Sequence, residues 1–134
     1  MATLSLSDPE HGWIDITFSG AQGSYQLTAS DVPNDCLSEL ASAVVHLSLG
    51  SDIETAYFSL EPGFATCRMQ READVVTMTL SCPNVDKPVF LTKVALVELR
   101  DNLRTELLRI KQMYSADDGW GQPFPAKTIE NLAD

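Results

Sequence analysis

The feature that most constrains the fold is a period-two alternation of apolar and polar residues, which is typical of strands with one buried face and one exposed face. Three such runs open the chain, and turn-forming stretches at residues 8–12 and 20–23 separate them. Their apolar members are Leu4 and Leu6, then Ile14, Ile16 and Phe18, then Tyr25, Leu27 and Ala29. This segment is therefore predicted to form a three-stranded meander.

A second set of alternating runs begins after residue 50, and the turn Glu61-Pro62-Gly63 interrupts it. The predicted strands cover residues 56–60, 64–71 and 75–82. Pro83 and Pro88 follow them. Because proline is tolerated in edge strands but not in central ones, a further short edge strand is expected at residues 89–91.

Apolar residues recur at helical spacing in two segments. Asn34 or Asp35 is predicted to cap the first helix, and Thr92 to cap a longer second helix that ends at Asp117-Asp118-Gly119. The charged residues of the second helix are expected to face solvent. The apolar positions are Leu37, Leu40, Ala41, Val44 and Leu47 in the first helix, and Leu96, Leu99, Leu103, Leu107 and Ile110 in the second.

These elements predict one α+β domain over residues 1–134. The expected order is βββ-α-βββ-(β)-α, with six or seven strands in an antiparallel or mixed sheet, both helices on one face, and a short C-terminal tail. The tail carries Trp120 and Phe124 and is expected to fold back and close the core, with a short capped segment at residues 128–132. A role as an aromatic binding hook is the alternative.

Charge is distributed very unevenly along the chain. The formal net charge is −10, and no Lys or Arg precedes Arg68. Direct binding of nucleic acid or of an anionic membrane is therefore not expected, since both depend on basic residues. A basic protein partner is expected instead, although acidity that serves only solubility is the plainer interpretation. The carboxylates before Arg68 are Asp8, Glu10, Asp15, Asp31, Asp35, Glu39, Asp52, Glu54 and Glu61.

No motif in the sequence encodes a reaction, and no cofactor or metal site is predicted. His11 and His46 have no nucleophile at a recognisable spacing, and His46 is expected at the boundary of the core. The three cysteines, Cys36, Cys67 and Cys82, lack paired metal or redox spacing and are expected to be reduced and mostly buried. The start of the chain lacks the pattern of a secretory signal, so a cytoplasmic location is expected.

The candidate binding residues follow from charge and expected exposure. Trp13 falls on the strand face opposite the apolar positions, beside Asp15, and is predicted to anchor a partner. The full candidate set is Asp8, Glu10, Trp13, Asp15, Asp31, Asp52, Glu54 and Glu61.

Three short motifs carry a resemblance to small bacterial proteins of polymorphic-toxin immunity type. They are residues 34–40 at the start of the first helix, the Glu61-Pro62-Gly63 turn, and Trp120 followed by Pro123-Phe124-Pro125, Ile129 and Leu132. The resemblance implies a single-domain interaction protein of strands and helices, and it transfers no binding residues.

The leading hypothesis is a non-enzymatic acidic domain that neutralises a basic toxin effector. A dimeric protein resembling secretion chaperones and an enzyme with an unrecognised carboxylate pair are the alternatives, and the chain is expected to be a monomer or a homodimer.

Overall fold

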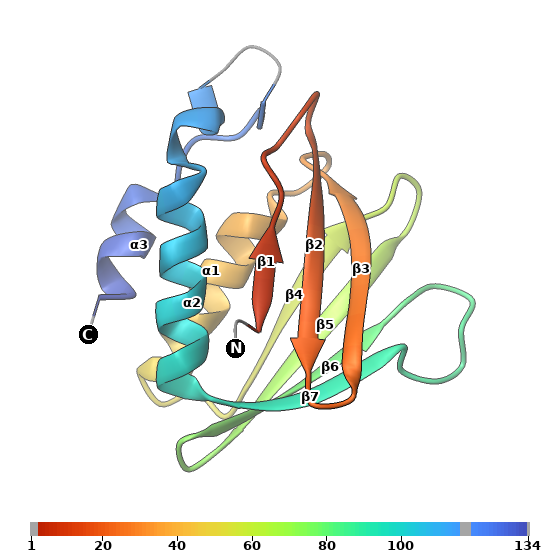
Figure 1. The fold of residues 1–134 in the computed structure, drawn as a ribbon, viewed down its shortest axis with the longest axis vertical. Helices are drawn as coiled ribbons and strands as arrows, with labels where there is room; N and C mark the ends of the chain where they lie inside the picture. The colour runs from red at the N-terminus through yellow and green to blue at the C-terminus, as the bar shows by residue number, and fades with distance from the viewer. Residues whose placement is uncertain (1–2, 116–118, 134) are drawn as a thin grey trace.

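The computed structural model describes residues 3–115 and 119–133. Within these residues the chain forms one antiparallel sheet of seven strands in the order β1-β2-β3-β4-β5-β6-β7, together with three α-helices (Figure 1). The predicted α+β class and strand order are confirmed. The sheet is purely antiparallel, so the mixed alternative is wrong.

The first arm of the sheet consists of β1 (Leu4–Leu6), β2 (Trp13–Gly20) and β3 (Gly23–Ser30). Ile14, Ile16 and Phe18 are buried and alternate with exposed or half-buried residues, as predicted. The register of the pairing between β2 and β3 is fixed, because a slip by one residue would move this apolar set to the solvent face.

The second arm consists of β4 (Ile53–Ser59), β5 (Phe64–Glu72), β6 (Val75–Ser81) and β7 (Phe90–Ala95). The predicted edge strand is present as β7, which pairs with β6 and is longer than expected. Thr92 lies inside it, opposite Met78. The prediction that Thr92 caps the second helix is therefore wrong, because pairing with β6 keeps this segment extended as far as Ala95.

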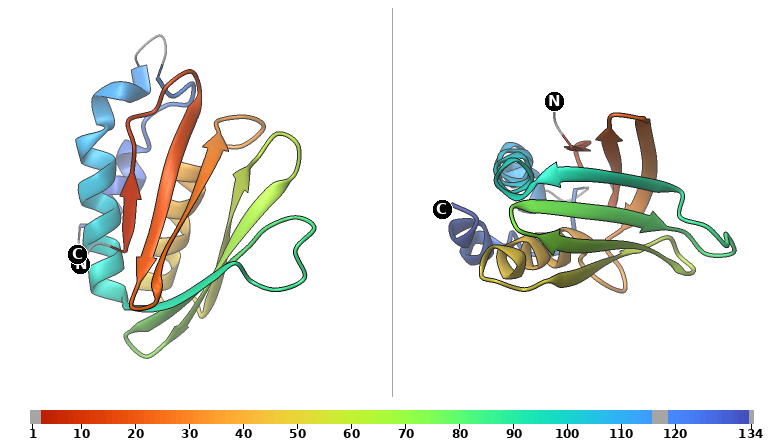
Figure 2. Two further views of the ribbon diagram at one scale, coloured as in Figure 1. Left: turned by 45° about the vertical axis from the view of Figure 1, so that its right-hand side comes forward. Right: turned by 90° about the horizontal axis from the view of Figure 1, so that it is seen from below.

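A single residue pair, Ser30 with Ser59, joins the two arms. The arms are set at an angle to each other, and β7 passes close to β2 at the other end of the sheet (Figure 2). There the rings of Phe18 and Phe90 lie 6.4 Å apart. A side chain at Gly20 would clash with Thr92, so glycine permits this close approach.

Helix α1 (Cys36–Ser48) lies against β4 and begins as predicted. Oδ1 of Asp35 accepts hydrogen bonds from the backbone N–H groups of Leu37, at 3.1 Å, and Ser38, at 3.3 Å. The carboxylate thus satisfies two of the amides that a helix start leaves without partners.

Helix α2 (Leu96–Arg109) begins after Ala95, whose side chain makes no capping hydrogen bond. It ends at Arg109, before the 3-10 helix η1 (Lys111–Ser115), so the predicted end at residues 117–119 is too late. Asp117 and Asp118 themselves lie outside the described residues.

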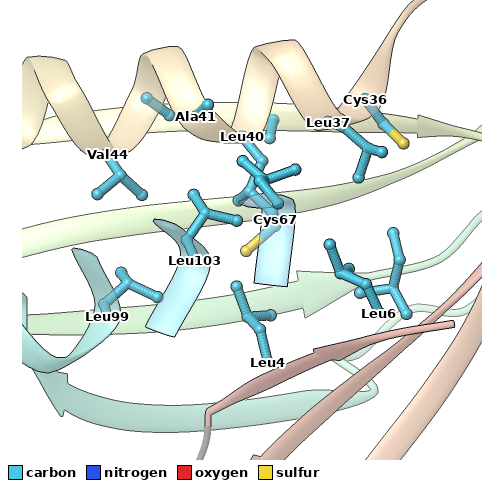
Figure 3. Packing of buried hydrophobic residues seen from close by; sticks show 14 of the residues in the cluster. Leu4, Leu6, Cys36, Leu37, Leu40, Ala41, Val44, Cys67, Leu99 and Leu103 are labelled. Atoms are coloured by element: carbon cyan, nitrogen blue, oxygen red, sulfur yellow. The ribbon is translucent and has the colours of Figure 1, made fainter. Parts of the chain in front are cut away.

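The core forms where α1 and α2 meet the sheet. Leu37 and Leu40 of α1 face Leu99 and Leu103 of α2 across a cluster that also contains Cys67 (Figure 3). All five are fully buried. Each buried leucine contributes about 1.5–3 kcal/mol relative to an exposed one, so the two apolar stripes found in the sequence supply much of the driving force for folding.

The tail closes one end of the core, as predicted. Trp120 is 1 % exposed, and its Nε1 donates to Oδ1 of Asp35 at 3.1 Å. The ring of Phe124 packs edge-on against Tyr114 at 5.0 Å. Helix α3 (Ala126–Asn131) follows, slightly earlier than the predicted segment at residues 128–132. The burial of Trp120 argues against its use as an exposed hook.

Side chains of α2 complete the free edge of β1. Oδ1 of Asn102 accepts from the backbone N–H groups of Thr3, at 2.8 Å, and Leu4, at 2.7 Å. Oε1 of Glu106 accepts from the N–H of Leu6 at 2.8 Å, and the guanidinium of Arg109 donates to the carbonyl of Leu6. The expectation that the charged residues of α2 all face solvent is wrong for Glu106 and Arg100, whose side chains are 16 % and 19 % exposed.

Candidate interaction surface

Five of the eight predicted binding residues lie near the β1–β2 hairpin, at one end of the molecule (Figure 1). Glu10 and Trp13 form an isolated bridge in this hairpin, and the N–H of Asp31 donates to the carbonyl of Gly12 beside it at 2.8 Å. We call these five residues the hairpin-end group: Asp8, Glu10, Trp13, Asp15 and Asp31.

Trp13 and Asp15 occupy the outer face of β2, as predicted. Trp13 is 37 % exposed, whereas Ile14 beside it is buried. Asp15 lies opposite Thr28 of β3, and its Oδ1 accepts a hydrogen bond from the Thr28 hydroxyl at 2.6 Å. A hydroxyl is a neutral donor, so this contact orients the carboxylate but leaves its negative charge in place.

Asp8 is the member of the group with a basic partner. Its Oδ1 lies 3.1 Å from Nη1 of Arg109, and both side chains are largely exposed. Hydrogen bonding to Glu106, followed by the contact with Asp8, raises the pKa of Arg109. The charge of Asp8 is thus compensated locally, although an exposed pair of this kind contributes at most about 1 kcal/mol to stability.

Asp31 ties the end of β3 to the tail. Its Oδ2 accepts from the backbone N–H of Gly121 at 2.6 Å, and a Cβ atom at Gly121 would lie 2.5 Å from the same oxygen. A Cβ at Gly12 would lie 2.8 Å from Oδ1. The carboxylate therefore has a structural role, and its described contacts are with neutral groups.

Asp52 and Glu54 lie at the opposite end of the molecule, where α1 connects to β4 (Figure 1). Glu54 contacts Nδ1 of His46 at 3.3 Å and accepts from the Ser51 hydroxyl at 2.6 Å. His46 is exposed and not at the core boundary as expected. The eight predicted residues therefore do not form one continuous acidic face.

The outer face of the second arm differs in chemistry from both ends. Register pairing aligns Thr55, Arg68, Thr79 and Leu91 in one row across β4 to β7. The next row contains Ile53, Gln70, Thr77 and Lys93. These two rows contain no acidic residue, and Glu72 follows in the next row, opposite Val75.

A pocket that the sequence did not predict opens where the two arms join. It has a volume of about 640 Å³, within the range of roughly 300–1,000 Å³ that is typical of ligand sites. One wall is formed by the residues that come directly after β3 in the chain, and the other is formed by the turn between β4 and β5. We call it the seam pocket, and it is lined by Val32, Pro33, Ser59, Glu61, Pro62, Gly63 and Phe64.

The polar groups of the seam pocket are few. Ser59 is 1 % exposed, and its Oγ has no hydrogen-bond partner among the described residues. Glu61 is exposed and has φ of 42°, a left-handed conformation that residues other than glycine rarely adopt. Phe64 is 41 % exposed, with its ring centroid 6.4 Å from that of Tyr57. The sequence predicts a turn at Glu61-Pro62-Gly63 and Glu61 as a binding candidate, but it does not predict this pocket.

The cysteines do not supply a reactive centre. Burial raises the pKa of Cys36, with the charges of Asp35 and Glu39 adding to the effect, and burial raises the pKa of Cys67 to about 12. Both thiols are therefore protonated at neutral pH and weakly nucleophilic. Cys82, expected in the core, is only partly buried because β6 ends at Ser81.

Residues 3–115 and 119–133 contain no cluster of three His, Cys, Asp or Glu side chains that could hold a metal ion. No helix within these residues has the length and apolar character needed to cross a membrane. Comparison with protein-family models, curated proteins and solved structures gives no match for this chain.

Proposed function

We propose that this chain is a non-enzymatic, acidic protein-binding domain whose partner is a basic protein, and most concretely an immunity protein that neutralises a basic toxin effector. The observation that carries the proposal is the absence of Lys and Arg from the first 67 residues, which hold nine carboxylates. Arg109 pairs with one of them, Asp8, at 3.1 Å.

The contacts of three further carboxylates support this proposal. Asp15, Asp31 and Asp35 accept hydrogen bonds from hydroxyl, backbone and indole donors, all of which are neutral. Neutral donors fix the carboxylates without cancelling their charge. The resulting field extends over about a Debye length, roughly 8 Å at physiological ionic strength, and accelerates encounter with a positively charged surface.

Trp13 supplies the short-range part of the proposed interface. Tryptophan is enriched among the residues that dominate binding energy, because it combines a large apolar area with a polar N–H. Its exposed ring lies two residues from Asp15 on the same outer face of β2. Electrostatic attraction would set the association rate, and burial of this ring would slow dissociation.

A dimeric function resembling that of secretion chaperones is the second candidate. The second arm favours it, because Ile53, Tyr57 and Leu91 are partly exposed on its outer face. Such a face would shield an unfolded segment or a second copy of the chain. Solution mass distinguishes the candidates: a stable dimer that binds an unfolded effector segment supports the chaperone, and a monomer that binds a folded basic protein supports the leading proposal.

The experiment that tests the leading proposal measures association kinetics with a basic partner captured from the native host. The association rate is expected to fall steeply between low and high ionic strength. The double substitution Glu10→Lys and Asp15→Lys is expected to lower the rate by about tenfold or more at low salt. The double substitution Asp52→Lys and Glu54→Lys, at the opposite end, is the matched control and is expected to have a much smaller effect. A rate that does not respond to salt would refute the charge mechanism.

A further inference from the structure

We infer that the seam pocket binds an arginine side chain of the basic partner, with the guanidinium between Glu61 and Phe64 and the methylene stem between Pro33 and Pro62. This inference deepens the proposed function and rests on it, since it assigns the partner residue that docks on this domain. The walls, floor and rim of this pocket differ in chemistry.

The walls of the pocket are apolar. Val32 and Pro33 form one side, and Pro62 with Phe64 forms the other. Val32 and Phe64 are exposed large apolar residues, at 49 % and 41 %. Rigid rings on both sides leave an opening suited to an aliphatic chain, which would gain hydrophobic stabilisation while the pocket walls lose little conformational entropy.

The floor of the pocket contains an unused hydrogen-bonding group. Ser59 is almost completely buried, and its hydroxyl has no partner among the described residues. Ser30, directly opposite in the sheet and equally buried, uses its hydroxyl to accept from the N–H of Val32 at 3.2 Å. An unpaired buried hydroxyl costs free energy, so a ligand that donates a hydrogen bond to Ser59 would recover part of that cost.

The rim of the pocket is negative. Glu61 lines it, and Asp31 directly precedes the lining residue Val32. The next charged residue is Glu54 along β4 and Arg68 along β5. Phe64 and Arg68 are four residues apart on β5, roughly 13 Å at the rise of a strand. A cationic group at the rim therefore meets a carboxylate first, whereas a purely apolar side chain would leave Glu61 without a partner.

Arginine fits this combination better than lysine does. Its planar guanidinium can stack on the face of Phe64 while its N–H groups pair with a carboxylate, and its weaker hydration lowers the cost of entering a partly buried site. Its apolar stem can lie along the prolines. Because Ser59 pairs directly with Phe64 in the sheet, a guanidinium stacked on Phe64 also lies beside the Ser59 hydroxyl and can donate to it. The ammonium group of lysine offers the charge without the stacking plane.

The test is an NMR titration of the full chain with short peptides whose termini are blocked. The first probe is acetyl-Gly-Arg-Gly-amide. The matched probes replace arginine by citrulline, which keeps the shape and removes the charge, by lysine, and by norleucine, which keeps only an aliphatic chain. The arginine peptide is expected to produce saturable shifts at Ser59, Glu61, Gly63 and Phe64. Its affinity should exceed that of the citrulline peptide by about fivefold, the effect of one exposed or partly buried charge contact.

Three substitutions then assign the contacts. Glu61→Gln is expected to remove the preference for arginine over citrulline, whereas Glu72→Gln, at the other end of β5, should leave it unchanged. Phe64→Ala should weaken the arginine peptide by about threefold to tenfold, and Val75→Ala is its control on the same outer face. Ser59→Ala should weaken binding without loss of fold, which amide spectra of the free protein would verify.

The outcomes separate this inference from the proposed function. Equal binding of the arginine and norleucine peptides, or no saturable shifts at the pocket with any probe, would overturn the arginine assignment. If a captured basic partner still binds with strong salt dependence in that case, the proposed function stands and the inference alone fails. If the arginine peptide occupies the pocket but the partner binds independently of salt, the proposed charge mechanism fails and the pocket assignment stands.

Discussion

The edge of β1 and the seam between β3 and β4 are two places where strand pairing stops, and they are completed in different ways. At the β1 edge, Asn102, Glu106 and Arg109 of α2 satisfy the backbone groups of the strand. At the seam, pairing is reduced to Ser30 with Ser59, and the hydroxyl of Ser59 has no partner among the described residues. The polar side chains at the β1 edge therefore stabilise the fold, whereas the Ser59 hydroxyl at the seam is available to a ligand.

The largest expected effect tests the β1 edge. Asn102→Leu removes the acceptor of two backbone N–H groups and the donor to the Leu4 carbonyl, so it should lower the free energy of unfolding by about 3 kcal/mol. Urea denaturation measures the change. Asn131→Leu, at an exposed position at the end of α3, is the control and should stay within about 0.5 kcal/mol of the unmodified chain. Equal stabilities for both variants would show that α2 does not secure this edge.

The closed end of the core provides the next comparison. Trp120→Phe keeps an aromatic ring but removes the Nε1 donor to the Asp35 carboxylate, and should lower the free energy of unfolding by about 2 kcal/mol. Trp13→Phe, on the exposed face of β2, should change it by less than about 0.5 kcal/mol. A larger loss for Trp13 than for Trp120 would reverse the assignment of structural and exposed tryptophans.

The buried thiols test the closed core through the pH dependence of the free energy of unfolding. The folded-state pKa of Cys67 is about 12, above the ordinary value of 9.0, so stability is retained below about pH 8.5 and lost as pH rises toward 12. Each buried thiol should contribute a slope of about −1.4 kcal/mol per pH unit in that window. Cys67→Ala should reduce the slope measured by urea denaturation, relative to the unmodified chain. An unchanged slope in this variant would contradict the burial argument.

The smallest effect tests the seam directly. Ser30→Ala removes an acceptor used by Val32 and should destabilise the chain by about 1 kcal/mol. Ser59→Ala removes a hydroxyl without a described partner, so stability should stay the same or rise by a few tenths of a kcal/mol. Thermal and urea unfolding of the two variants measure the difference. A loss for Ser59→Ala as large as that for Ser30→Ala would show that this hydroxyl is already used within the fold.

Local patterns were enough to predict most of the elements. Alternation in β2 and β6 placed Ile14 and Met78 in the core, and the position of Asp35 before an apolar stripe predicted the start of α1. Thr92 misled the prediction because a threonine before an apolar stripe is a good helix cap. Pairing with Met78 on β6 outweighed that local preference, and the helix begins three residues later than predicted, with Ala95 at the N-cap.

The candidate surface was predictable only in part. The exposure of Trp13 followed from the period of its strand, and the structure has it on the outer face of β2. The sequence did not predict that the carboxylates are divided between two ends of the molecule. It also did not predict the pairing of Asp8 with Arg109, which lie about a hundred positions apart in the chain. No local pattern encodes such a contact.

The sequence by itself determined the α+β class, the order of the strands, the faces that are buried and the excess of negative charge, because each of these depends on residue type and short-range spacing. The tertiary structure decided which carboxylates are compensated, how the edge of β1 is closed, and where a pocket opens. These features arise from distant segments meeting across the bend between the two arms, and a contact between distant residues depends on the packing of the whole chain.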